Sequence, residues 1–109
     1  MTGTIGDARL RGPLLERRPA VHELKCWPEF FEAIALGEKR HDLRRSRDRH
    51  FEVGDQLRLR EYEPASSSYT GREQMVVVTY ITSAERQCAL SNEALHPDFC
   101  ILSIAPLTP

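Results

Sequence analysis

The stretch GEKRHDLRR, from Gly37 to Arg45, joins a helical pattern to a strand pattern and so organises the whole chain. Gly37 ends the helical pattern, and seven of the eight residues after it carry an acid, a base or an imidazole. Polar and apolar residues then begin to alternate. Charge at this density, directly behind a helix rich in aromatic residues, either covers a solvated edge or lines a binding site.

A helix is expected immediately before this stretch, over residues 28–36. Pro28 suits the first turn, where its missing N–H would have no partner, and Glu29 complements the positive end of the helix dipole. Gly37 is placed to close the helix in a left-handed conformation. The expected buried face consists of residues that recur at helical spacing, namely Phe30, Phe31, Ile34 and Ala35.

Strand patterns account for most of the remaining chain. Leu57 and Leu59 alternate with arginines, which predicts a strand with the leucines inward and Arg58 and Arg60 outward. A nearly continuous apolar run at 74–81 predicts a central strand buried on both faces. The five expected strands cover residues 21–25, 39–45, 56–62, 74–81 and 99–104.

Turn signals separate these strands. Residues 64–71 are rich in serine, proline and glycine and predict a loop or long hairpin connection, whereas 82–97 predicts irregular chain with one helical turn near 91–95. The fold class is therefore α+β and mainly β. We expect a small β-barrel of about five strands with one main helix packed against it.

Composition limits what the protein can be. The 109 residues fit one domain, and 40% hydrophobic with 28% charged residues is typical of a soluble globular protein. No apolar run could span a bilayer and no secretory signal is visible, so we expect no membrane partner and a cytoplasmic location. Three separated cysteines predict reduced thiols and no metal site, and four scattered histidines predict polar surface residues; no cofactor is expected.

The N-terminal residues 1–19 predict a flexible arm outside a domain that covers residues 20–106. The arm carries four arginines that either contact a polyanion or are simply solvated: Arg9, Arg11, Arg17 and Arg18. The whole chain has a net charge of -1, so any attraction to an anion must be local.

Positive charge is concentrated between Glu38 and His50, where six lysines and arginines face three carboxylates. Strand alternation puts Arg40, Asp42 and Arg44 on one face and Lys39, His41, Leu43 and Arg45 on the other. An aspartate between arginines holds a guanidinium in place, and a positioned cation then meets a phosphate or a base edge. A solvated face with ion pairs along the strand is the alternative.

Aromatic residues supply possible stacking surfaces for bases. The candidates are Trp27, Tyr62 and Tyr69. The alternatives are that Trp27 packs in the core and that Tyr69 lies in a solvated loop.

Five ordered blocks carry a family resemblance. The blocks are HELK at 22–25, WPxFFxA at 27–33, GxKxxDxR at 37–44, FxVGD at 51–55, and LREY at 59–62 followed by YTGRE at 69–73. From about His22 to Ile104 the chain resembles the DUF3850 domains, a branch of the ASCH domains within the PUA-like superfamily. The resemblance implies a PUA-like β-barrel with a cleft between barrel and helix, and RNA, a nucleotide or a modified base as ligand.

The resemblance also implies that the GxKxxExR motif lies at this cleft, which here places Gly37, Lys39, Asp42 and Arg44 there. The chain departs from the motif twice. Asp42 replaces the usual glutamate, and Arg40 replaces a frequent threonine after the lysine. Both departures keep the cationic character of the stretch and suit anion binding better than hydrolysis.

The expected function is RNA or nucleotide binding. One alternative is a hydrolase, either an amidohydrolase on acylated cytidine or a ribonuclease, with Lys39 and Asp42 as catalytic residues and Glu61 or Glu63 as a candidate base. A second alternative is a module that docks an acidic protein partner. The expected ligand-binding residues are Lys39, Arg40, Asp42, Arg44, Arg45, Trp27 and Tyr62.

Overall fold

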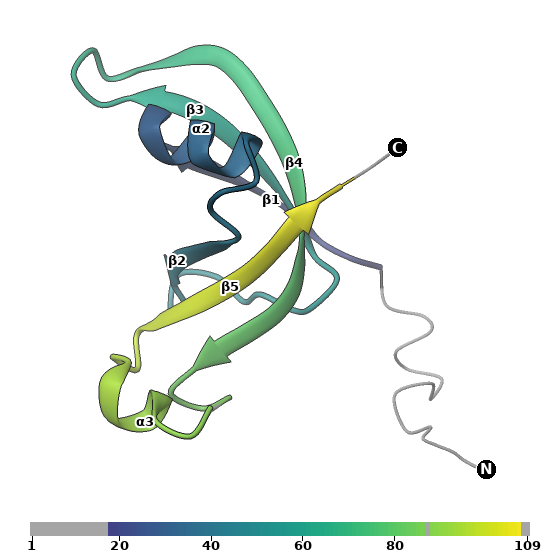
Figure 1. The fold of residues 1–109 in the computed structure, drawn as a ribbon, viewed down its shortest axis with the longest axis vertical. Helices are drawn as coiled ribbons and strands as arrows, with labels where there is room; N and C mark the ends of the chain where they lie inside the picture. The colour runs from purple at the N-terminus through teal and green to yellow at the C-terminus, as the bar shows by residue number, and fades with distance from the viewer. Residues whose placement is uncertain (1–17, 87, 108–109) are drawn as a thin grey trace.

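The computed structural model describes residues 18–86 and 88–107, which form one strongly curved sheet with two helices (Figure 1). The five strands lie in the order β1-β3-β4-β5-β2. The sheet is a half-barrel, which confirms the expected mainly β class. Most of the predicted arm, residues 1–17, lies outside the described residues. The strands are β1 (Val21–Cys26), β2 (His41–Arg45), β3 (Gln56–Glu63), β4 (Ser68–Ser83) and β5 (Phe99–Pro106).

The sheet is antiparallel except at one edge, where β1 runs parallel to β3. The expected alternation in β3 is confirmed, because Leu57 and Leu59 are fully buried. These leucines belong to a single core that also takes in α2 (Pro28–Ala35) through Phe31 and Ile34. No described helix is long and apolar enough to cross a membrane.

Strand β4 differs from its prediction in length and burial. It is the middle strand of the sheet but starts at Ser68, so the last four residues of the expected loop belong to the strand, where Ser68 and Tyr69 pair with β3. It is not buried on both faces either, because Val76 and Val78 point into the core while Tyr80 is 57% exposed. An apolar run alone does not distinguish a doubly covered strand from one with apolar residues on its solvent face.

Helix α2 is closed as expected by Gly37, which has a φ of 81°. The expected apolar face is only half correct: Phe31 and Ile34 are buried, whereas Phe30 is 43% exposed and Ala35 is also exposed. A helix of eight residues that lies on one side of the sheet buries only a narrow stripe. The amide of Gln74 fixes this stripe to β4 by donating to the Phe31 carbonyl over 2.9 Å.

The turn before β3 is organised by Asp55, whose side chain is fully buried. Its carboxylate accepts hydrogen bonds from the backbone N–H groups of Ala20 and Glu52 and contacts His22 Nε2 at 2.9 Å. His22 is therefore part of a buried polar network, and its prediction as an ordinary surface residue was wrong. The expected helical turn near 91–95 is confirmed as α3 (Ser91–Ala94).

Candidate functional site

A hollow of about 350 Å³ lies where the start of α2 meets the end of β1 and the edge strand β2. We call it the α2 hollow. It brings together four of the predicted site residues with four others. Its lining consists of Lys25, Cys26, Trp27, Phe30, Lys39, Asp42, Leu43 and Arg44.

Two exposed aromatic rings form one wall of the α2 hollow. Trp27 is 47% exposed, so the alternative that it packs in the core is wrong. Its ring lies nearly parallel to that of Phe30, with an interplanar angle of 16° and centroids 6.1 Å apart. The pair forms at the helix start, because Trp27 is the N-cap residue of α2 and Phe30 is its third residue. The exposed area is flat, apolar and open to a ligand.

Two lysines line the α2 hollow together with these rings, and Lys39 is the one close to Phe30. Lys39 Nζ lies 5.7 Å from the centroid of the Phe30 ring and 3.5 Å from His41 Nε2. Lys25 Nζ lies 4.3 Å from the centroid of the Tyr62 ring. Among the described residues no carboxylate oxygen comes within 4.0 Å of either ammonium group. Both charges are thus available to an anion.

The floor of the α2 hollow is an ion pair. Arg44 Nε donates to Asp42 Oδ2 over 2.7 Å, and the Asp42 residue is buried. Arg44 Nη2 also donates to the Lys25 carbonyl over 2.9 Å, so this side chain crosses from β2 to β1. In the described part of the chain no backbone hydrogen bond joins these two edge strands. Arg44 therefore closes the half-barrel with a side chain where a full barrel would have a strand pair.

The thiol of Cys26 lies buried at the back of the α2 hollow. Burial is the main reason that its pKa rises from 9.0 to about 11, and the negative charge of Asp42 raises the pKa further. Cys26 is therefore a neutral, apolar side chain at physiological pH and supplies no nucleophile. No group of three histidine, cysteine or acidic side chains suited to a metal ion occurs within residues 18–107, position 87 excepted.

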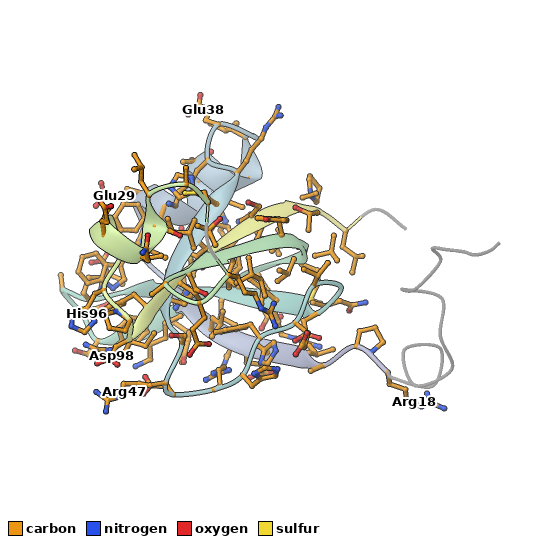
Figure 2. All side chains as sticks on the ribbon, turned by 90° about the horizontal axis from the view of Figure 1, so that it is seen from below. Arg18, Glu29, Glu38, Arg47, His96 and Asp98 are labelled. Carbon is orange, nitrogen blue, oxygen red and sulfur yellow. The ribbon has the colours of Figure 1, made fainter. Side chains whose placement is uncertain are left out.

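The other predicted site residues lie outside the α2 hollow. Arg40 turns back to donate to the Gly37 carbonyl over 3.2 Å, and Arg45 lies over the Phe99 ring at 5.3 Å. Glu38, at the start of the charged stretch, points away from the sheet (Figure 2). Tyr62 packs edge-on against Tyr69, which lies in β4 and not in the solvated loop of the alternative prediction.

Two residues that have a role in the proposed site, Phe30 and Lys25, were not predicted as site residues from the sequence. Phe30 was assigned to the buried face of α2 because it recurs at helical spacing with Phe31 and Ile34, but a helix that buries only a narrow stripe leaves it exposed. Lys25 was placed on a strand without a role, since nothing in its local pattern shows that the helix start folds over it. Its alternation with the buried Leu24 and Cys26 did indicate that it faces outward.

The fold and the site together define a class of protein: a small, mainly β half-barrel whose single main helix borders a cationic and aromatic hollow. Within this class the chain belongs to the DUF3850 family, a domain of unknown function, whose model matches residues 21–104. It is also similar to an uncharacterized 12.9 kDa protein in the GpA 3' region of Escherichia phage P2, with 34% identity over 62 residues. That match covers 57% of this chain and 54% of the phage protein, about half the length of each.

Proposed function

We propose that this protein binds RNA or a nucleotide in the α2 hollow. The observation that carries the proposal is the exposed Trp27–Phe30 pair beside two lysines that have no carboxylate within 4.0 Å in the described chain. A base presents a π-face to an aromatic surface, and its phosphate presents charge to an ammonium group. A nucleotide is the common ligand that needs both features at neighbouring positions.

In this proposal each residue has a separate role. Trp27 and Phe30 support the base, while Lys39 and Lys25 bind the phosphate. Arg44 acts as a positioning residue, because its Nε and Nη2 groups are engaged by Asp42 and the Lys25 carbonyl. Its Nη1 group has no hydrogen-bond partner among residues 18–86 and 88–107, so it remains able to reach a ligand oxygen.

The ASCH and PUA-like resemblance supports the same class of ligand, since it implies RNA or a nucleotide at the cleft between barrel and helix. A hydrolase is supported less well. Its expected carboxylate, Asp42, is held by Arg44 at 2.7 Å, which favours a counter-ion over a general base. Cys26 at the same site is neutral and buried.

Isothermal titration of the full chain with nucleoside monophosphates tests the proposal. Lys39→Gln should weaken binding about tenfold, because one charge-assisted hydrogen bond contributes on the order of 1.5 kcal/mol. Arg47→Gln is the matched control, since Arg47 pairs with Asp98 at 2.9 Å and lies outside the α2 hollow. Equal losses in the two variants would contradict the assignment of Lys39, and no binding by the parent chain would contradict the function.

A further inference from the structure

We infer that the ligand is a single-stranded nucleic acid several nucleotides long, which leaves the α2 hollow and follows a groove along the seam between β1 and β2. The seam is the gap that Arg44 bridges from Asp42 to the Lys25 carbonyl. This inference rests on the proposed function and narrows it, because it selects a polymer over a free nucleotide.

Three neighbouring hollows lie along the seam and together form the proposed groove. A second hollow of about 360 Å³ shares Lys25 and Arg44 with the α2 hollow. A third, of about 340 Å³, shares Arg44 and Arg49 with the second. Arg44 thus borders all three spaces. A strand that binds in the α2 hollow would pass over the Arg44 side chain to reach the other two hollows.

Charge along the groove suits a polyanion. Its three hollows are lined by six lysines and arginines and only three carboxylates, in a chain whose net charge is -1. Two of these cations are already paired with carboxylates, Arg44 with Asp42 and Arg60 with Glu73. Among the described residues Lys25, Lys39 and Arg49 have no carboxylate oxygen within 4.0 Å. Successive phosphates would supply the missing negative charge.

An exposed aromatic ring occurs again in the second hollow of the groove. The Arg60 guanidinium lies 3.9 Å from the centroid of the Tyr69 ring, and Tyr69 is 42% exposed. Lys25, which borders both the α2 hollow and the second hollow, lies over the Tyr62 ring. Aromatic surfaces separated by cations are the arrangement that binds successive bases and phosphates of a single strand. An acidic peptide would match the cations but would leave both aromatic surfaces without a partner.

Fluorescence anisotropy with labelled oligouridylates of one to about eight nucleotides tests this inference on the full chain. Affinity should rise steeply up to about four nucleotides and then level off. For the longer oligomers, log K against log salt should have a slope of about -2, as expected when about three phosphates are neutralised, whereas a mononucleotide should give a slope shallower than -1.

Two variants in the second hollow test the groove separately from the α2 hollow. Arg49→Gln and Tyr69→Leu should each weaken the binding of an octanucleotide about five- to tenfold and leave uridine monophosphate binding unchanged. Arg47→Gln is the control for the first, because Arg47 lies in the same loop but points outward at the edge of the molecule (Figure 2). Tyr80→Leu is the control for the second, since Tyr80 is equally aromatic and lies outside the groove.

The possible outcomes distinguish a failure of this inference from a failure of the proposed function. Affinity that stays the same from one nucleotide to eight overturns this inference and leaves the proposed function standing. Failure of every nucleotide and oligomer to bind removes both. Binding of oligoglutamate as tight as that of the oligouridylate also overturns the inference, because the groove would then recognise charge without bases.

Discussion

Arg44 donates hydrogen bonds to two acceptors, Asp42 on β2 and the Lys25 carbonyl on β1. Its side chain should therefore contribute to the stability of the fold. The Asp42 side chain is only 10% exposed and that of Arg44 22%, so the pair is largely shielded from water. Removing one partner of such a pair leaves a buried charge without compensation, which is costlier than removing both. Arg44 was predicted from the sequence as a ligand contact, but local pattern could not reveal that the β1 backbone lies within its reach.

A double-mutant cycle measures this role. Arg44→Gln should lower the free energy of unfolding by about 2–3 kcal/mol, because the Asp42 carboxylate then remains buried without a cation. The double variant Asp42→Asn/Arg44→Gln should lose less than the sum of the two single variants. Urea unfolding monitored by circular dichroism gives all four values. Additive losses would show that the two side chains do not form the pair.

The three cysteines have different environments, and their reactivity should separate accordingly. Cys88 is exposed, and hydrogen bonds from the Leu90 backbone and the Ser91 side chain lower the pKa of its thiol. Burial raises the pKa of Cys100 and brings that of Cys26 to about 11. Because the thiolate is the reactive form, iodoacetamide near pH 7.5 should label Cys88 first.

Mass spectrometry of the labelled chain measures the order in which the three cysteines react. Cys26 should react at a measurable rate only when the pH approaches 11 or when the chain is unfolded, since its proton is retained below that pH. A Cys88→Ser variant should show almost no fast labelling. Rapid modification of Cys26 in the folded chain at neutral pH would contradict its buried, neutral state.

At the scale of elements, the charged stretch depends on how α2 ends. Gly37 adopts a φ of 81°, and a Cβ at this position would meet no atom within 4 Å. Any cost of Gly37→Ala therefore comes from backbone conformation and not from a clash. The helix exit fixes where Lys39 enters the α2 hollow, because the Lys39 N–H donates to the Ala33 carbonyl over 3.1 Å.

Gly37→Ala should thus lower the free energy of unfolding by about 1 kcal/mol, as expected for a non-glycine residue forced into a left-handed conformation. Thermal unfolding followed by circular dichroism gives the value. Gly37→Asn is the control, since asparagine tolerates this conformation better and should lose less. An alanine variant as stable as the parent chain would show that the helix ends in another way in solution.

Local sequence patterns predicted where helices and strands form better than they predicted which side chains are buried. The proline and glycine that flank α2, and the alternation in β3, are decided within a few residues, so their predictions were confirmed. The exposed side of β4 and the exposed Phe30 depend on what covers them, which is a property of the whole sheet. The length of β4 was missed because the serines, proline and glycine of residues 64–71 indicated a loop, whereas Ser68 and Tyr69 pair with Glu63 and Tyr62 of β3.

At the scale of the whole molecule, the half-barrel brings together residues that are far apart in the sequence. Lys25, Lys39 and Tyr69 come from different elements, and curvature of the sheet gathers them around one seam (Figure 1). Of the stretch from Gly37 to Arg44, Lys39 and the segment 42–44 line the α2 hollow, whereas Gly37 and Arg40 do not. The second wall, and the groove beyond Arg44, follow from the approach of β1 to β2, which no single stretch of sequence encodes.

The central claim is that a base stacks on Trp27, and the chain carries its own probe, because Trp27 is its single tryptophan. Titration with adenosine monophosphate should quench Trp27 fluorescence to a plateau, whereas ribose 5-phosphate, which has the charge but no base, should leave the fluorescence nearly unchanged. Lys39→Gln should shift the quenching curve to about tenfold higher nucleotide concentration. Fluorescence that does not respond to any nucleotide, or that responds equally to ribose 5-phosphate, would contradict stacking at the α2 hollow.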